Sequence, residues 1–548
     1  MRPRLAMIVG IAVMASALGA PPRASAEEGA GELRLTLRSE PKSFNPMLVD
    51  EISGITIRYL TGGVLARVNR KTQKLEPELA VSWKESNGGR KISFQLREGV
   101  FFSDGTPFSA EDVAYTMRTL MDPKLHSPTG DSFRASEQPV VIETSGKYKV
   151  SILFAVPIAG LAALFDEVAI VSAAAKDKDK AVLGPFYVAD YKPGSYVYLN
   201  RNNNYWKHDA QGKSLPYLKA VRLDIQQNRD TELLRFSRGE VDLIETLEPE
   251  QFDRLRQQDP AAARDAGPSL EGEEWWFNQA PTAPIPEYKK AWFRSQKFRG
   301  AISRAINRND IARVVFHGHA APASGPFSPA NVFWFNQSLR PPGFDQKAAL
   351  AMLQQDGFRM DNHTLRDHDG NAVEFSVITN AGNKPRERMA ALLQQDLLGI
   401  GIKLNLVTLD FPSVIDRIAR NYNYESCLLG LTNVDLDPNQ EMNVWLSSAE
   451  NHQWNPNEKT PATPWEAQID KLMRAQASTL DAKKRKQYFD EVQQIVLDQA
   501  PFIYLVNKNS LSGISPAVRG ADPVVLHPRT FWNIEHLALD PEKVKNRK

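Results

Sequence analysis

The chain has 548 residues, of which 42% are hydrophobic and 24% are charged, a composition typical of a soluble globular protein. This length exceeds what one hydrophobic core usually supports, so we expect two or three domains. Its 67 basic and 65 acidic residues give a formal net charge of +2, and this balance excludes the strongly basic surface of a nucleic-acid-binding protein.

The first 26 residues have the pattern of a cleavable secretion signal. Arg2 and Arg4 precede an uncharged apolar run over residues 5–20, and Ala24-Ser25-Ala26 supplies the small side chains that a signal peptidase requires. We therefore expect cleavage after Ala26 and export of the mature chain to the periplasm.

Neither a lipid anchor nor a membrane span is expected in the mature chain. The single cysteine, Cys427, lies far from the cleavage site, and it leaves no partner for an intramolecular disulfide. The apolar run over residues 151–175 is interrupted by Pro157, Gly160 and the acidic pair Asp166-Glu167. Charges are costly in lipid, so we interpret this run as a core helix with a flanking strand.

Residues 79–123 combine a hairpin with a capped helix. Apolar side chains alternate with polar ones over residues 91–97, as in a half-buried strand, and Asn87-Gly88-Gly89 can supply the positive φ angles of a tight turn. Ser109 has the position of a helix N-cap, and Asp122-Pro123 ends the helix.

A second set of strand signals begins at Gly184. In the second half of the chain, predicted strands and helices then alternate. Residues 373–377 predict a strand, residues 386–398 a helix and residues 402–406 the next strand. This order predicts a largely parallel sheet with helices on both faces.

Two segments carry candidate binding residues. In a strand over residues 274–278, Trp276 and Asn278 would face a cleft while Trp275 and Phe277 face a core; alternatively, both tryptophans lie in the core. The loop over residues 430–438 follows an apolar strand, and open α/β sheets bind ligands at the carboxyl ends of their strands.

Five segments, taken in order, resemble the bacterial extracellular solute-binding proteins of family 5, the peptide-type capture proteins of ABC importers. These are LAVSWKESNGGRKISFQLREGVFFSDGTPFSAEDVAYTMRTLMDP (79–123), AISRAINRNDIARVVFHGHAAPASGPFSP (301–329), DQKAALAMLQQDGF (345–358), LLQQDLLGIGIKL (392–404) and APFIYL (500–505). The resemblance implies an α/β fold, a two-lobed periplasmic binding protein of type II (cluster C-like) with an extra mixed α+β N-terminal domain.

The resemblance also implies lobes that are joined by crossing strands and built from separate stretches of chain. After the signal peptide (residues 1–26), we expect residues 27–62, 184–283 and 512–548 to form the first lobe. Residues 63–183 would form the extra domain, and residues 284–511 the other lobe.

The family pattern bears on the ligand site. It places the segment around Trp276 where the chain crosses between lobes, which favours the cleft orientation. Val434 stands where peptide-binding members carry an aspartate for the ligand's amine, and Asn380 where dipeptide-binding members carry an arginine for its carboxylate. Because both charge anchors are replaced, simple dipeptides should bind poorly, and Asp435 is the acid placed to hold an amine.

The resemblance implies capture of an organic solute, first of all an oligopeptide, and delivery to an inner-membrane ABC permease with its ATPase subunits. A nickel complex, haem, an oligosaccharide or an opine remain alternative ligands. We expect a monomer with the following ligand contacts: Trp276 by stacking, Asn278, Asn380, Thr432 and Asn433 by hydrogen bonds, and Asp435 by charge.

Catalytic and metal motifs are weak. Ser39-Glu40-Pro41-Lys42 matches the S-x-x-K pattern, but Pro41 would break the helix that this pattern needs. The pairs His317/His319 and His363/His368 supply too few ligands for a metal centre. We expect no cofactor, no metal and no catalytic residue; an exported peptide hydrolase and a periplasmic chaperone are the competing classes.

Overall fold

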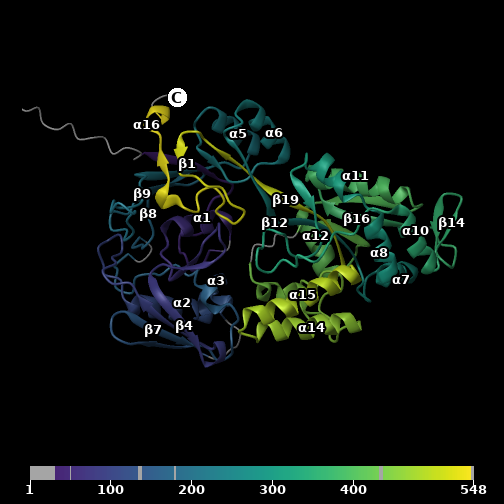
Figure 1. The fold of residues 1–548 in the computed structure, drawn as a ribbon, viewed down its shortest axis with the longest axis horizontal. Helices are drawn as coiled ribbons and strands as arrows, with labels where there is room; N and C mark the ends of the chain where they lie inside the picture. The colour runs from purple at the N-terminus through teal and green to yellow at the C-terminus, as the bar shows by residue number, and fades with distance from the viewer. Residues whose placement is uncertain (1–30, 50, 134–138, 178–179, 431–435, 545–548) are drawn as a thin grey trace, which may run out of the picture.

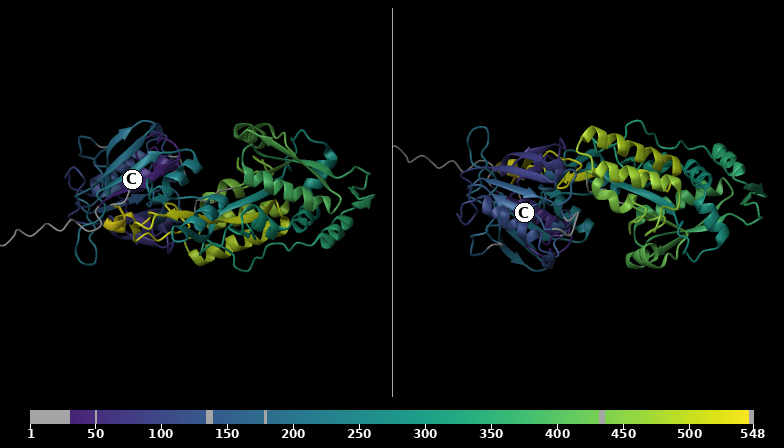
Figure 2. Two further views of the ribbon diagram at one scale, coloured as in Figure 1. Left: turned by 90° about the horizontal axis from the view of Figure 1, so that it is seen from above. Right: turned by 90° about the horizontal axis from the view of Figure 1, so that it is seen from below.

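The computed structural model describes residues 31–49, 51–133, 139–177, 180–430 and 436–544. The N-terminal part, purple to blue in Figure 1, lies at one end of the long axis and the green part at the other. Two long strands run between the two ends, and the views from above and below in Figure 2 show the same division. We call the two ends the first and the second lobe.

The first lobe contains a four-stranded sheet in the order β1 (Glu32–Leu37), β10 (Ala220–Ile225), β9 (Tyr196–Arg201) and β8 (Phe186–Lys192). β1 is parallel to β10, and the other pairs are antiparallel. Alternate residues of β1 are buried, and they pack with the apolar face of helix α1 (Ile52–Thr61).

A second four-stranded sheet, with a core of its own, forms the α+β unit of this lobe. Its order is β4 (Ala80–Ser86), β5 (Lys91–Leu96), β7 (Lys149–Leu153) and β6 (Val141–Thr144), and helix α2 (Ala110–Leu120) contributes to the same core. The predicted hairpin turn is confirmed, because Asn87, Gly88 and Gly89 all have positive φ. The predicted cap of α2 is also confirmed: the Ser109 amide donates to Asp112 Oδ2 at 2.7 Å in a capping box.

The apolar run over residues 151–175 contains the end of β7 and the short helix α4 (Leu161–Leu164), as expected for core segments. In the described part of the chain, no helix combines the length and the apolar character that crossing a membrane would require.

The second lobe is built on a seven-stranded sheet. Six strands follow the order β11 (Leu243–Ile244), β19 (Phe502–Ile514), β12 (Ala263–Phe277), β18 (Ser426–Leu429), β16 (Glu374–Asn380) and β17 (Lys403–Leu409), and β13 (Ala320–Pro322) pairs with β19. β16 is parallel to both of its neighbours, β17 and β18. β12 is antiparallel to both of its neighbours, β19 and β18. The prediction of a largely parallel sheet therefore holds for β16, β17 and β18, and the long pair makes the sheet mixed.

Helices cover both faces of this sheet. α7 (Glu287–Arg294), α8 (Gln296–Ala305), α10 (Gln346–Gln355) and α11 (Lys384–Leu398) share one core with Trp275. α12 (Phe411–Asp416), α14 (Pro464–Ala477) and α15 (Ala482–Gln499) share another core with Trp276. The middle strands are consequently buried on both sides.

The shorter elements connect these layers. They are β2 (Ala66–Val68), β3 (Leu75–Pro77), α3 (Pro128–Asp131), α5 (Arg229–Ser237), α6 (Pro249–Gln258), α9 (Arg308–Asp310), β14 (Arg359–Asp361), β15 (Thr364–Arg366), α13 (Met442–Trp445), β20 (Val518–Arg519), β21 (Ala538–Leu539) and α16 (Pro541–Val544).

The strands β12 and β19 join the lobes. They pair with each other along most of their length, β19 pairs with β11 at one end, and β12 pairs with β18 at the other. Their register shifts at three places, which lets the pair bend between the lobes. The chain crossings are thus where the two lobes meet, and the exact domain boundaries given above stay a prediction.

Candidate functional site

A cavity of about 1740 Å³ lies where the crossing strands pass between the lobes. Its walls include Arg58 and Gln73 from the first lobe, Glu271 and Lys508 from the two crossing strands, and Arg386 from α11 of the second lobe. The volume exceeds the roughly 300–1,000 Å³ of a site for one drug-sized ligand. The cavity is therefore large enough for an extended solute that touches both lobes.

Paired charges line the crossing strands at this cavity. Lys508 Nζ lies 3.1 Å from Glu271 Oε2 and 3.4 Å from Glu273 Oε1. Arg529 Nη2 lies 2.5 Å from Glu271 Oε1, and Arg386 Nε lies 2.8 Å from Glu273 Oε2. Burial opposes ionisation of Glu271, but the charges of Lys508 and Arg529 outweigh it and lower its pKa to about 2. Glu271 is thus ionised, and each charged side chain of the network lies beside one of opposite sign.

The C-terminal segment is tied to the same wall by Glu245. This carboxylate accepts hydrogen bonds from the backbone amides of Arg529, at 2.9 Å, and Thr530, at 2.7 Å, and His527 Nδ1 lies 3.2 Å away. Burial raises the pKa of Glu245, but the hydrogen bond and charge of His527 and the bonds from Thr530 and Arg529 lower it to about 2.

An aromatic side chain from the second lobe is exposed on the wall. Phe333 is 46% exposed and packs edge-on against Trp334, with ring centroids 4.8 Å apart. The Arg485 guanidinium also contacts Trp334, at 4.9 Å from the ring centroid. Arg485 is itself paired with Asp437 at 2.5 Å. Phe333 therefore rests on a fixed support and presents free apolar surface to a ligand.

Two contacts bridge the lobes beside the cavity. Gln73 Nε2 donates to the carbonyl of Ala330 at 2.5 Å, and the Val332 amide donates to Gln73 Oε1 at 3.1 Å. Arg388 of α11 pairs with Glu250 of α6 at 2.5 Å. Gln73, Arg388 and Glu250 all line the cavity, so these contacts hold its walls together.

The structure corrects the expectation for Trp276. Its side chain is fully buried, its indole N–H donates to the Tyr424 hydroxyl at 3.2 Å, and its ring packs edge-on against Phe502. Trp275 is fully buried on the opposite face of β12. Because helices cover both faces of this strand, both tryptophans lie in the core, which was the alternative interpretation.

Asn278 is also buried, and its expected ligand contact is corrected as well. Its Nδ2 donates to the carbonyls of Tyr422 and Tyr424, both at 2.8 Å, and its Oδ1 accepts from the Ala280 amide at 3.1 Å. The side chain therefore fastens the chain after β12 to the turn before β18, and it does not reach the cavity wall.

Asn380 does not line the cavity itself but contacts a residue that does. Its Oδ1 accepts a hydrogen bond from Arg386 Nη1 at 2.7 Å, and Arg386 in turn lines the cavity. The predicted residues Thr432, Asn433 and Asp435 lie outside the described residues, together with Val434, and their roles stay predictions. The next residues, Leu436 and Asp437, do line the cavity.

Sequence reasoning missed the charged network and Phe333. The one local signal was the group Glu271, Glu273 and Glu274 just before the apolar end of the strand. Their partners come from β19, α11 and the C-terminal segment, and no local pattern links these stretches of sequence.

The family model described as bacterial extracellular solute-binding proteins, family 5 middle, matches residues 74–453. A probable ABC transporter-binding protein of Deinococcus radiodurans is 25% identical over 526 residues, which cover 87% of this chain and 86% of that protein. The oligopeptide-binding protein AppA of Bacillus subtilis is 23% identical, with 92% of this chain and 91% of that protein covered.

Solved structures agree in fold. The structure of Bacillus subtilis AppA in complex with a nonapeptide covers 93% of this chain and 99% of that chain, with 22% identity and a TM-score of 0.68. NikA from Brucella suis in complex with Fe(III)-EDTA gives the same coverage, with 20% identity and a TM-score of 0.78. The two-lobed fold with crossing strands and the family match lead to one conclusion: the chain belongs to family 5 of the bacterial extracellular solute-binding proteins.

Proposed function

We propose that this protein is the solute-binding component of an ABC importer and that it captures an oligopeptide between its lobes. The observation that carries the proposal is the cavity of about 1740 Å³ at the crossing strands, lined by both lobes. Such a volume suits an extended ligand better than a single small molecule. The nonapeptide complex of AppA, a relative with the same fold, supports this ligand class.

Capture works through closure of the lobes. A ligand that contacts both walls favours the arrangement in which the walls are close, because it gains contacts there that it lacks when the lobes are apart. Two contacts between the walls favour the same closed arrangement. They are the contact of Gln73 with Ala330 and Val332 and the pair Arg388–Glu250. The permease then docks on the closed form at the inner membrane.

The charge pattern of the cavity fits a ligand whose own charges are few or far apart. Lys508 and Arg386 are already paired with Glu271 and Glu273, so neither cation needs a ligand carboxylate as counter-ion. Breaking a buried pair to serve a zwitterion would leave a partner uncompensated. A longer or blocked peptide can instead use its backbone hydrogen bonds and the apolar surface of Phe333.

The location and chemistry of the protein follow from the same proposal. The leader over residues 1–26 directs export, and the mature chain acts in the periplasm as a monomer without a membrane anchor. Binding and release need no covalent step, so the protein acts as a carrier and not as a peptide hydrolase. Asp435 stays the residue proposed to hold a ligand amine.

The proposal is tested by native mass spectrometry of protein purified from its own periplasm, followed by calorimetry with the peptides that are recovered. Phe333→Ala should weaken binding of such a peptide by about 1–3 kcal/mol, because it removes a large apolar contact. Phe344→Ala is the matched control, since Phe344 is also 46% exposed but lies away from the cavity. Recovery of a non-peptide solute, or equal affinities for both variants, would contradict the proposal.

A further inference from the structure

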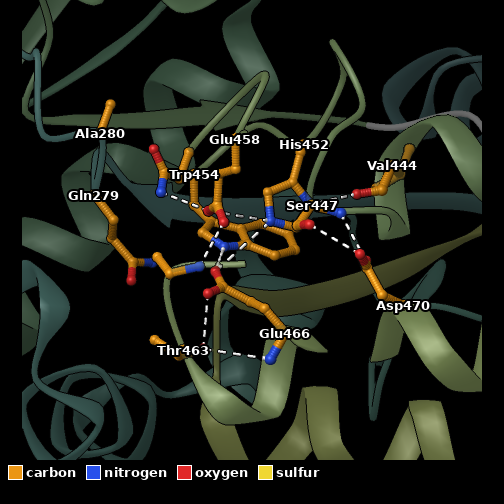
Figure 3. Close-up of polar contacts among 12 residues, drawn as sticks. Gln279, Ala280, Val444, Ser447, His452, Trp454, Glu458, Thr463, Glu466 and Asp470 are labelled. Carbon is orange, nitrogen blue, oxygen red and sulfur yellow. Dashed lines mark hydrogen bonds and ion pairs between the residues drawn. The ribbon is translucent and has the colours of Figure 1, made fainter. Parts of the chain in front are cut away.

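Three buried ionisable side chains converge in the second lobe, outside the ligand cavity. His452 and Glu458 lie on the segment between α13 and α14, and Glu466 lies in the first turn of α14 (Figure 3). Their side chains are 1%, 5% and 3% exposed. His452 Nε2 lies 3.9 Å from Glu458 Oε1 and 3.7 Å from Glu466 Oε1, and the three atoms all lie within 4.8 Å of one another.

The histidine is oriented as a ligand. Its Nδ1 lies 2.9 Å from the carbonyl oxygen of Val444, which can only accept, so Nδ1 carries a proton. In the neutral ring this leaves a lone pair on Nε2, the atom that faces the two carboxylates. A hydrogen bond from the distal ring nitrogen to a backbone carbonyl is the usual arrangement around a metal-binding histidine. Among the described residues, Nε2 has no hydrogen-bond partner.

Both carboxylates are held in place by neighbouring donors. Glu466 accepts from the Trp454 indole N–H at 2.8 Å and from the Thr463 hydroxyl at 2.7 Å. Glu458 accepts from Asn455 Nδ2 at 2.5 Å and from the Ala462 amide at 2.7 Å. These bonds fix the direction of each carboxylate. Glu458 Oε1 accepts the Asn455 bond and Glu466 Oε1 the Trp454 bond, and both oxygens lie beside the imidazole. The group is therefore organised before any ion arrives.

The cluster has an excess of negative charge. The charged groups around it are Asp470 on α14, which accepts from Ser447, and Arg299 on α8, whose charge acts on Glu466 from a distance. Arg299 donates its hydrogen bonds to Gln279 and to the backbone carbonyls of Phe293 and Gln499, and not to the carboxylates. Burial, and then the charge of Glu466, raise the pKa of Glu458 to about 7. Apart from His452 itself, the described surroundings thus supply no cation in contact with this pair.

We propose that His452, Glu458 and Glu466 bind one divalent transition-metal ion of the Zn²⁺ class. One imidazole nitrogen and two carboxylate oxygens form a donor set that Zn²⁺ accepts, at about 2.0–2.2 Å from each atom. Separations of 3.7 and 3.9 Å between Nε2 and the two oxygens leave room for an ion between them. The ion neutralises the carboxylates and gives Nε2 a partner.

The role of the ion is structural. The His452 ring packs at a tilted angle against Trp454, with centroids 3.8 Å apart, and Trp454 packs edge-on against Phe502 of the crossing strand β19. An ion that joins His452, Glu458 and Glu466 fastens the segment between α13 and α14 to this core. None of the three residues lines the ligand cavity, so the metal site is independent of solute capture.

The test uses the mature chain, stripped with a chelator, dialysed with Zn²⁺ and then freed of excess metal. Elemental analysis should give one equivalent of zinc per chain, and zinc should raise the melting temperature, because an ion that binds only the folded state stabilises it. A chain that retains no zinc, or whose melting temperature does not respond, would overturn the proposal. The solute plays no part in either measurement.

Glu458→Gln separates metal binding from folding. The amide has nearly the same shape, can still accept from the Ala462 amide, and removes a buried charge, so the apo variant should fold with equal or higher stability. It should nevertheless bind zinc more weakly by at least the roughly 10–100-fold that loss of a supporting residue costs. Glu450→Gln, an exposed change in the same segment, is the control and should keep its zinc. Full zinc binding by Glu458→Gln would refute the assignment.

A pH series adds a second readout for metal binding. Carboxylate and imidazole ligands must be deprotonated to bind a metal, so the increase in melting temperature on adding zinc should be larger at pH 8 than at pH 5.5. An increase that is the same at both pH values, or that persists in Glu458→Gln, would show that zinc binds elsewhere.

Discussion

At the scale of single residues, the most consequential group is Lys508. Its ammonium lies between Glu271 and Glu273 of the neighbouring strand, and Glu273 is shared with Arg386 of the second lobe. Burial lowers the pKa of Lys508, but the charges of Glu273 and Glu271 outweigh burial and raise it. The lysine therefore stays charged, and its charge helps to keep Glu271 ionised at the junction of the lobes.

Lys508→Met should destabilise the fold by about 2–3 kcal/mol, somewhat less than the removal of one partner from a fully buried pair, because the lysine is partly exposed. Urea unfolding followed by tryptophan fluorescence measures the change. Lys471→Met, on the exposed face of α14, should stay within about 0.5 kcal/mol of the wild type. Equal effects of the two changes would show that the network adds nothing to stability.

The low pKa values of Glu245 and Glu271 predict a loss of stability in acid. Both are about 2 in the folded protein, below the usual carboxyl range, so their contribution is present above pH ~4.5 and is lost as pH falls towards 2. Unfolding free energies measured from pH 6 to pH 2.5 should fall along this window. The fall should be shallower in Glu271→Gln and unchanged in the exposed control Glu450→Gln; a curve for Glu271→Gln that matches the wild type would be evidence against the assignment.

At the scale of elements, local signals were sufficient where the structure is local. The turn at Asn87-Gly88-Gly89 and the cap at Ser109 depend on residues a few positions apart, and both were predicted correctly. The orientation of Trp276 was not, because an alternating pattern does not reveal that helices cover both faces of a strand. Those helices come from distant parts of the sequence.

The same reasoning explains why the sequence did not predict the ion network or the His452 cluster. The ion network joins β12, β19, α11 and the segment after β19. The His452 cluster joins the segment between α13 and α14, which has no periodic pattern, to the first turn of α14. Only the folded arrangement brings these residues together. The fold, by contrast, was predicted in outline because several ordered segments resembled one family over most of the chain.

The cap of α2 gives a prediction at this scale. Ser109 Oγ accepts from the Glu111 amide at 3.3 Å, so Ser109→Ala should cost about 1 kcal/mol locally. Hydrogen exchange read by mass spectrometry should show faster exchange in the first turn of α2, and Ser82→Ala, an exposed change on β4, should leave that turn unaffected. Unchanged exchange in Ser109→Ala would mean that the Asp112 side chain alone sustains the cap.

At the scale of the whole molecule, the two lobes meet through the crossing strands and through contacts beside the cavity. Arg388 and Glu250 are each about half exposed, so their pair is weak by itself. Such a pair can still shift the balance between open and closed arrangements, because it joins α6 to α11 and both residues line the cavity.

Arg388→Glu should therefore favour the open arrangement. Repulsion from Glu250 should increase the radius of gyration of the free protein and weaken peptide affinity a few-fold, as expected for an exposed pair worth up to about 1 kcal/mol. The double variant Arg388→Glu, Glu250→Arg should restore both quantities. Arg359→Glu, an exposed reversal on β14, serves as the control. Failure of the double variant to restore affinity would argue against an interaction between these two residues.

The central claim is that an oligopeptide is captured by closure of the two lobes around the cavity. Small-angle X-ray scattering of the mature chain, titrated with a peptide recovered from the native protein and in parallel with Ala-Ala, tests it most directly. The radius of gyration should fall to a plateau at one equivalent of the oligopeptide and should not change with the dipeptide. Tight binding of the oligopeptide with an unchanged scattering curve would contradict capture by closure.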